Sequence, residues 1–292
     1  MHQPLLIFTD LDGSLLDHHS YSYAPAIPTL QQLEKLKVPI IPTTSKTYEE
    51  LLCLRKELNN QHPFIVENGA AIYVPKGYFQ TAPPKHHLVS SYEKDEFDCY
   101  VFSKCRETWQ SLLQHLSRFF PDEFITFAQL GPSGIQSSTG LSSADAEKAN
   151  SREFSEPLIW KSTEQRKQAF IAMLIESGAN VLQGGRFLNV TGNCDKGQAL
   201  KWLSEYYKKE KKNDELISIA AGDSQNDVAM LDAADKAIII RSPVAPSPLI
   251  RNPNKYQTQA TGPEGWTEGI KYFTNLRSES TTTHTPDLYS KR

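Results

Sequence analysis

The sequence has few cysteines, no long apolar run and no excess of basic residues. Its 292 residues include four cysteines without a CxxC or other zinc-ligand spacing, so reduced thiols are expected, and nothing favours a Cys99–Cys105 disulfide. No stretch is apolar over the length of a membrane span, and no signal-peptide pattern follows Met1. A net charge of −3 argues against a nucleic-acid-binding surface, which would be basic. These absences predict a cytoplasmic protein that binds neither membranes nor nucleic acids, and they leave its oligomeric state open.

What the sequence does have is enough apolar material for a core, arranged as alternating strand and helix patterns at both ends of the chain. The hydrophobic fraction is 39%. Continuous apolar strands separated by helices indicate a parallel sheet covered on both faces. The expected strands are residues 5–9, 38–43, 64–66, 216–221 and 237–240, and the expected helices are residues 25–37, 47–58, 196–207 and 226–234. The predicted fold class is α/β, with a Rossmann-like parallel sheet as its core.

The chain between these two parts has a different texture. It contains a segment rich in Gly, Ser and Pro at 131–143. Helical patterns are expected at 104–119 and 164–177, and short strands at 124–127, 158–160, 180–183 and 187–190. We expect an inserted α+β cap domain over 83–190 and a discontinuous core formed by 1–82 and 191–275. Residues 276–292 have no apolar period and are expected to be a disordered tail.

Two aspartates follow the first expected strand at once. Asp10 and Asp12 come directly after the apolar run 5–8, where the strand would end and Gly13 would start a turn. Open α/β folds keep their active sites at this edge of the sheet. A carboxylate there can attack phosphorus and form an aspartyl-phosphate, while a second carboxylic acid protonates the leaving oxygen and then accepts a proton from water. Two solvated aspartates in a turn are the alternative, but the full stretch 8–14 is more specific than a bare pair.

A second acidic group, Gly-Asp-Ser-Gln-Asn-Asp at 222–227, also follows an apolar strand directly. Mg²⁺ prefers hard oxygen ligands in octahedral geometry and retains several waters. A sufficient contribution from the protein would be Asp10, the main-chain carbonyl of Asp12, and Asp223. Asn226 and Asp227 would orient the waters or the ligating groups. Taken alone, this segment is also typical of a turn and a helix cap.

Two further segments carry groups suited to a phosphoryl group. Thr44 ends the second expected strand and can hydrogen-bond a phosphoryl oxygen, with the amides of Ser45 and Lys46 nearby. Lys196 opens a helix and can neutralise the transferring phosphoryl group and Asp10. A threonine and serine run before a helix more often only caps it, and a lone Lys-Gly pair has little specificity. The position of Lys196 between the threonine segment and the last acidic segment favours the catalytic interpretation.

Segments 10–14, 43–46, 195–197 and 222–227 resemble the motifs of the haloacid dehalogenase superfamily of phosphatases, in the same order. The resemblance implies a cap of the C2B type between the second and third motifs, and Mg²⁺ as the cofactor. Carried over motif by motif, it implies the following roles: Asp10 the nucleophile, Asp12 the general acid and base, Thr44 the second-motif hydroxyl, Lys196 the third-motif lysine, and Asp223 the metal ligand, supported by Asn226 and Asp227.

Within the superfamily, the chain resembles the mannosyl-3-phosphoglycerate phosphatases. The resemblance rests on residues 43–47, 67–73, 154–157 and 184–187, with Thr-Ser-Lys at 44–46 where general C2B sugar phosphatases usually have Thr-Gly-Arg. It implies dephosphorylation of mannosyl-3-phosphoglycerate to mannosylglycerate, so the expected partner is a small phosphorylated sugar or glycosyl-phosphoglycerate. The residues expected to bind that substrate offer polar groups or a cation, and they are Ser45, Lys46, Asn68, Gly184, Gly185 and Arg186. For Gly184 and Gly185 a tight hairpin turn is an equally good explanation.

Three rival functions stay open. A phosphatase of another sugar phosphate, such as glucosyl-3-phosphoglycerate or sucrose phosphate, would use the same polar groups. A phosphomutase would return the phosphoryl group to a sugar. A non-catalytic sugar-phosphate-binding protein would need no nucleophile, so the complete set of acidic, hydroxyl and lysine groups argues against it.

Overall fold

Strands from both ends of the chain form one parallel sheet. The computed structural model describes residues 4–183, 187–274 and 276. In its five-stranded sheet, of order β13-β12-β11-β1-β2, all neighbouring strands run parallel. The strands are β1 (Leu5–Thr9), β2 (Ile40–Pro42), β11 (Ile217–Gly222), β12 (Lys236–Arg241) and β13 (Lys255–Thr261). The parallel sheet of the predicted fold class is thereby confirmed.

Helices pack against this sheet and bury its apolar strands. Helix α9 lies against β12 and β13 and contacts the turn η1, while α8 lies against β11 and β12 and contacts α7. Helix α2 begins with a capping box, in which Thr47 and Glu50 satisfy each other's free amides. The helices and 3₁₀ turns are η1 (Ala24–Ala26), α1 (Ile27–Lys35), α2 (Tyr48–Glu57), η2 (Glu67–Gly69), α7 (Lys196–Lys211), η3 (Gln225–Asp227), α8 (Val228–Ala233) and α9 (Gly262–Thr274).

A second, antiparallel sheet lies beside β2. Its order is β3-β4-β6-β5, with β3 (Phe64–Val66), β4 (Ala71–Pro75), β5 (Ser90–Lys94) and β6 (Phe97–Val101). A single bridge between Thr43 and Ile65 joins it to the end of β2. The buried side chains of β4 and β6 share one hydrophobic cluster with β1. Strands β5 and β6 fall within 83–190, and the division of the chain at residue 83 stays a prediction.

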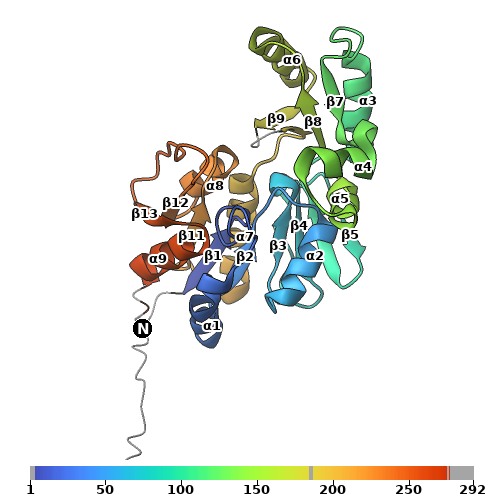
Figure 1. The fold of residues 1–292 in the computed structure, drawn as a ribbon. Helices are drawn as coiled ribbons and strands as arrows, with labels where there is room; N and C mark the ends of the chain where they lie inside the picture. The colour runs from blue at the N-terminus through green and yellow to red at the C-terminus, as the bar shows by residue number, and fades with distance from the viewer. Residues whose placement is uncertain (1–3, 184–186, 275, 277–292) are drawn as a thin grey trace, which may run out of the picture.

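The inserted cap is built on a third sheet, which is also antiparallel. Its order is β7-β8-β10-β9, and Figure 1 shows it with α3 and α6 at the end of the molecule away from the parallel sheet. These elements are α3 (Arg106–Leu116), β7 (Phe124–Thr126), β8 (Glu156–Trp160), α6 (Glu164–Glu176), β9 (Asn180–Gln183) and β10 (Leu188–Thr191). They enclose their own hydrophobic cluster around Trp109 and Phe170. The predicted α+β insertion is confirmed.

Two helices run through and beyond the segment rich in Gly, Ser and Pro. Helix α4 (Phe127–Thr139) contains Pro132 and is kinked at Gly131, whose φ is 61°. Helix α5 (Ser143–Asn150) packs on α4 through a small cluster that includes Ile135 and Ala146. In Figure 1 the pair lies between the third sheet and α2 of the core.

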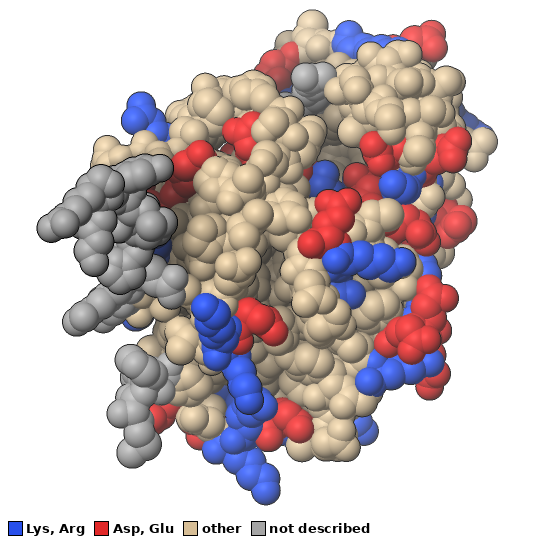
Figure 2. All heavy atoms as spheres, turned by 60° about the horizontal axis from the view of Figure 1, so that its bottom comes forward, with Lys and Arg blue, Asp and Glu red and all other residues tan. Residues whose placement is uncertain are grey.

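The surface agrees with the low net charge. On the face shown in Figure 2, acidic and basic side chains are interspersed. The four cysteines are free thiols, with Cys99 buried and Cys105 exposed. Among the helices of the described residues, none is long and apolar enough to cross a membrane. The expected tail lies outside the described residues, apart from Leu276.

Candidate active site

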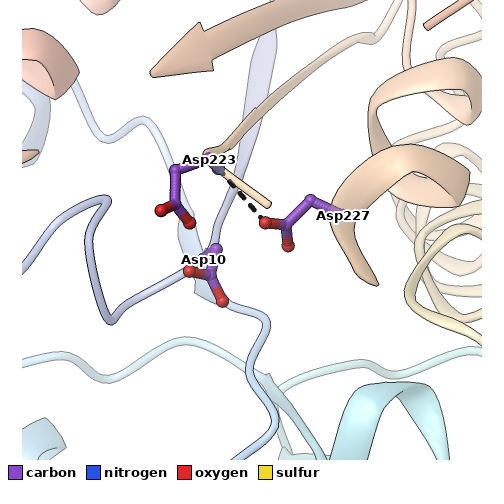
Figure 3. A group of neighbouring side chains, drawn as sticks. All are labelled: Asp10, Asp223 and Asp227. Carbon is purple, nitrogen blue, oxygen red and sulfur yellow. Dashed lines mark hydrogen bonds between the residues drawn. The ribbon is translucent and has the colours of Figure 1, made fainter. Parts of the chain in front are cut away.

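Asp10 and Asp223 lie at the carboxyl ends of neighbouring parallel strands. Asp10 follows β1 and Asp223 follows β11, and the amide of Asp10 donates to the carbonyl of Ala221 at 2.8 Å. Figure 3 shows their carboxylates beside that of Asp227, and one oxygen from each lies within 4.8 Å of the others. All three side chains are buried. The tertiary structure thus brings the two acidic groups of the sequence together at one edge of the sheet.

Lys196 supplies a positive charge to this cluster. It is the first residue of α7, and its side chain is 0% exposed. Its Nζ donates to Oδ1 of Asp10 at 2.6 Å and to Oδ1 of Asp227 at 2.7 Å. Asp195 caps the same helix by accepting a hydrogen bond from the amide of Gln198, at 2.8 Å. The cap residue therefore fixes where the helix starts, and with it the position of the ammonium group.

Burial and mutual repulsion raise the pKa values of the clustered carboxyl groups. For Asp10, desolvation is the largest cause and the Asp227 carboxylate the next, and they hold its pKa well above the usual range although Lys196 acts in the opposite direction. Desolvation and Asp227 also raise the pKa of Asp223 to about 7. Burial would lower the pKa of Lys196, but Asp10 and Asp227 outweigh it and raise that pKa. The one ammonium group of Lys196 does not balance the negative charge that the three carboxylates carry when they are ionised.

The donor set of this cluster fits a magnesium ion. Carboxylate and carbonyl oxygens are the ligands that Mg²⁺ prefers. Gly13 has φ +80°, and a Cβ at this position would lie 2.6 Å from Oδ2 of Asp223, so only glycine lets the main chain after Asp12 approach that carboxylate so closely. Asp227 already accepts hydrogen bonds on both oxygens, from Lys196 at 2.7 Å and from the amides of Asp223 and Ser224 at 3.2 and 3.1 Å. These bonds favour an orienting role for Asp227 over direct binding of the ion.

Mg²⁺ should stabilise the protein more at pH 8 than at pH 5. Asp223 has a folded-state pKa of about 7 against 3.8 for the free group, so the unfolded chain ionises first and stability falls as the pH rises through this interval. The loss in the metal-free protein should be on the order of a few kcal/mol. A bound cation relieves the repulsion only where the carboxylates are ionised. Thermal midpoints measured in EDTA and in Mg²⁺ across this pH range test the point, with Asp223→Asn expected to flatten the metal-free profile. An equal effect of Mg²⁺ at both pH values would contradict it.

Asp12 lies at the rim of the cluster, paired with Lys46. Its Oδ2 accepts from Nζ of Lys46 at 2.8 Å, and its side chain is 39% exposed. Its Oδ1 is buried and has no hydrogen-bond partner among the described residues. The Asp12 carboxyl group is therefore held in place through one oxygen, while the other is left without a protein partner. A carboxyl group with one unpaired oxygen suits the proton exchange that is predicted for Asp12.

The segment 44–46 lies next to these carboxylates and is held by the turn η2. The hydroxyl of buried Thr44 accepts from the amide of Lys46 at 3.2 Å. The amides of Asn68 and Glu67 each donate at 2.9 Å to a carbonyl of this segment. Gly69 has φ +94°, and a Cβ there would lie 2.2 Å from the carbonyl oxygen of Asp195, so η2 also packs against the start of α7. One turn thus connects two of the four segments found in the sequence.

Asn68 contacts the last acidic segment as well. Its side-chain oxygen accepts from Nδ2 of Asn226 at 3.0 Å, and Asn226 accepts in turn from the hydroxyl of Ser224 at 2.5 Å. The structure therefore gathers Asp10, Asp12, Thr44–Lys46, Asn68, Lys196, Asp223, Asn226 and Asp227 in one place. Gly184, Gly185 and Arg186 lie outside the described residues, and the roles predicted for them stay predictions.

Two charged residues that join this site to the cap were not predicted from the sequence. Glu67 is fully buried, and its carboxylate accepts from the amides of Glu153 and Phe154 at 2.8 and 3.2 Å. Arg152 donates to the carbonyl of Ser45 at 3.1 Å. Glu67 occurs in a stretch that supports the narrower resemblance, and an acidic residue directly after an apolar strand is the only local hint of its role.

Residues 7–243 of the chain match the haloacid dehalogenase-like hydrolase family. The order of the four segments and their convergence at the carboxyl edge of a parallel sheet agree with that match. The chain belongs to the haloacid dehalogenase-like hydrolase family, and the superfamily predicted from its motifs is confirmed.

Comparison with individual proteins shows which kind of hydrolase the chain resembles. Over 266 residues the chain is 34% identical to a protein of Methanococcoides burtonii named glucosyl-3-phosphoglycerate/mannosyl-3-phosphoglycerate phosphatase, and the match covers 91% of this chain and 95% of that one. The predicted enzyme class, a phosphatase, is thereby confirmed.

Solved structures share the fold. A protein of Thermoplasma acidophilum superposes with a TM-score of 0.63 at 15% identity, covering 93% of this chain and 99% of its own. The sucrose-phosphatase of Synechocystis, solved with sucrose and phosphate, superposes with a TM-score of 0.60 at 15% identity, covering 93% and 98%. At these identities the structures show the fold alone, and they agree with the predicted fold class.

Proposed function

We propose that the protein is a Mg²⁺-dependent cytoplasmic phosphatase that removes the phosphate of mannosyl-3-phosphoglycerate or glucosyl-3-phosphoglycerate. The observation that carries the reaction type is the buried contact between Asp10 and Lys196 at the end of β1, with Asp12 beside it. The substrate class rests on the stretches that resemble the mannosyl-3-phosphoglycerate phosphatases and on the name of the Methanococcoides burtonii relative, which includes both sugars.

The first step would form a phosphorylated Asp10. Lys196 holds Oδ1 of Asp10, which leaves Oδ2 to attack phosphorus. The bond from phosphorus to the glycerate oxygen breaks, and Asp12 gives that oxygen its proton. Thr44 and the amides of Ser45 and Lys46 would bind the phosphoryl oxygens as charge develops on them.

The second step would return the enzyme to its starting state. Asp12, now ionised, takes a proton from water, the water oxygen attacks phosphorus, and the bond to Asp10 breaks with release of inorganic phosphate. Asp10, the carbonyl of Asp12 and Asp223 would hold Mg²⁺, which when bound offsets the negative charge of the phosphoryl group and the carboxylates. Closure of the cap over the site would exclude bulk water from the first step.

Substrate choice would be made by groups around the phosphoryl site. We assign Ser45, Lys46 and Asn68 to this role, together with Gly184, Gly185 and Arg186. A glycerate carboxylate needs a cation, and Arg186 can meet it with two parallel hydrogen bonds. Lys46 is held by Asp12, so it would face the substrate next to the proton-transferring group.

A panel of phosphate esters tests the substrate class. With Mg²⁺, both glycosyl-3-phosphoglycerates should be hydrolysed with kcat/KM at least about tenfold above that of sucrose phosphate or a simple hexose phosphate, a difference of ~1.4 kcal/mol. Without Mg²⁺, all rates should fall. Preference for sucrose phosphate would reassign the substrate, and conversion of one sugar phosphate isomer into another without release of phosphate would identify a mutase instead. If no ester were hydrolysed, the remaining hypothesis would be a non-catalytic sugar-phosphate-binding protein.

A further inference from the structure

The three successive carbonyl groups of segment 44–46 are all held by hydrogen bonds. The first and the last accept from the amides of Asn68 and Glu67, each at 2.9 Å. The middle one, the carbonyl of Ser45, accepts from Nη2 of Arg152 at 3.1 Å. The outer two donors belong to the core turn η2, whereas Arg152 comes from the chain between α5 and β8, 107 positions further along.

The contact of Arg152 determines where the next amide points. A peptide group is planar and trans, so its carbonyl and its N–H point in opposite directions. The carbonyl of Ser45 and the amide of Lys46 belong to one such group, and that amide donates to the Thr44 hydroxyl at 3.2 Å. Rotation of this one peptide group would turn the Lys46 amide away and break its hydrogen bond to the Thr44 hydroxyl. Both groups are assigned to bind the phosphoryl oxygens.

Arg152 is itself fixed on several sides. Its side chain is 9% exposed, Nη1 donates to the hydroxyl of Ser155 at 3.0 Å, and Nη1 lies 3.7 Å from a carboxylate oxygen of Glu67. Glu67 also accepts from the Ser155 hydroxyl and from the amides of Glu153 and Phe154. Burial raises the pKa of Glu67, while Arg152 and these donors act in the opposite direction. A buried, multiply bonded guanidinium group has little freedom to move alone.

A second contact links the same two parts of the chain. The hydroxyl of Thr47, directly after segment 44–46, donates to the carbonyl of Lys148 at 2.8 Å. Lys148 lies in α5, which packs on α2. Residues 148–155 therefore contact Ser45 and Thr47, on both sides of Lys46.

We propose that Arg152 is a positioning residue for phosphoryl transfer, which holds the Ser45–Lys46 peptide group in its phosphate-binding orientation and so couples the inserted cap to the phosphate-binding segment. The inference rests on the proposed role of segment 44–46. The alternative is direct contact between Arg152 and the sugar or glycerate of the substrate. The bonds to Ser45 and Ser155 disfavour it, because among the guanidinium nitrogens only Nε has no partner within the described residues.

The two roles can be separated with probes that contain neither the sugar nor the glycerate. We would measure hydrolysis of p-nitrophenyl phosphate and inhibition by orthovanadate for the wild type, Arg152→Met, Arg152→Lys and the control Arg118→Met, which changes an exposed arginine of the cap. Arg152→Met should lower kcat for the small ester at least about tenfold and weaken vanadate inhibition by a similar factor, because displaced donors bind a phosphoryl group poorly. Arg118→Met should match the wild type.

Arg152→Lys should shift both values in the same direction by a smaller factor. It keeps the charge beside Glu67 but cannot span Ser45 and Ser155 as the planar guanidinium does. If Arg152→Met fails to fold, this variant decides by the same criteria. The inference would be overturned if a folded Arg152 variant kept the wild-type kcat for the small ester and the wild-type inhibition by vanadate. It would also be overturned if the only change were a higher KM for glycosyl-phosphoglycerates. A wild-type protein that neither hydrolyses the small ester nor binds vanadate would refute the proposed function before any variant is measured.

Discussion

Asp10→Asn should lower phosphate release by at least about 10³-fold while leaving the fold intact. An amide cannot attack phosphorus as a carboxylate does, so the covalent intermediate would not form. The stability of the folded protein should not decrease, because burial and the Asp227 carboxylate already disfavour the charged form of Asp10 and raise its pKa. We expect an unchanged or slightly higher thermal midpoint. The measurements are phosphate release from the best ester of the panel and a thermal melt in EDTA.

Asp214→Asn is the matched control for this experiment. Asp214 is exposed, so the same loss of a carboxylate should change neither activity nor stability. Substantial phosphate release by Asp10→Asn would show that another group is the nucleophile. A beryllium or aluminium fluoride mimic of aspartyl-phosphate that binds the wild type but not this variant would place the phosphoryl group on Asp10.

Lys196→Met should destabilise the metal-free protein by roughly 3–5 kcal/mol near pH 8 and abolish turnover. Lys196 is fully buried between Asp10 and Asp227, so its removal leaves two buried carboxylates without their cation. Lys196 also acts to lower the pKa of Asp10, so that pKa should rise further in the variant. In the variant the folded-state pKa of Asp10 lies above its value in the unfolded chain. The loss of stability is therefore complete at a pH above the folded-state pKa, and it becomes smaller as the pH falls.

Urea unfolding in EDTA at pH 8 and pH 5 measures this effect. Lys201→Met, an exposed position on the same helix, should change stability little at either pH. A deficit of the same size at both pH values would mean that Lys196 contributes packing and not charge. A small deficit at pH 8 would mean that water or another cation reaches the carboxylates.

The parallel core was predictable because its signal is local. The strand before Asp10 and the strand before Asp223 consist mainly of apolar residues, and both are buried on their two faces in the structure. The capping box at Thr47 needs residues only three apart, and it forms as the sequence indicates.

Elements whose stability comes from packing were not predicted. Strand β13 has only one buried residue, Thr258, and no apolar run. Helix α9 contains Gly262, Gly265 and Gly269, which oppose a helix. Helix α9 forms because Trp266 and Ile270 are buried, and its glycines allow close contact with β12 and β13. Helix α4 likewise crosses a stretch rich in Gly, Ser and Pro, and it depends on the small hydrophobic cluster that it shares with α5.

The reacting groups of the site could also be predicted from short stretches of sequence. A carboxylate directly after an apolar strand lies at the carboxyl edge of the sheet, whichever strand becomes its neighbour. What no local pattern contains is the pairing of distant polar groups. Lys196 between Asp10 and Asp227, Lys46 on Asp12, and Arg152 with Glu67 behind Ser45 depend on which surfaces meet when the core closes and the cap folds against it. Hydrophobic periodicity depends on residues that are close together along the chain. It therefore determines the helices and strands, and with them the reaction that the residues at their ends can support. Buried hydrogen bonds are directional and join residues far apart in sequence, so the tertiary structure alone decides how the reacting groups are held.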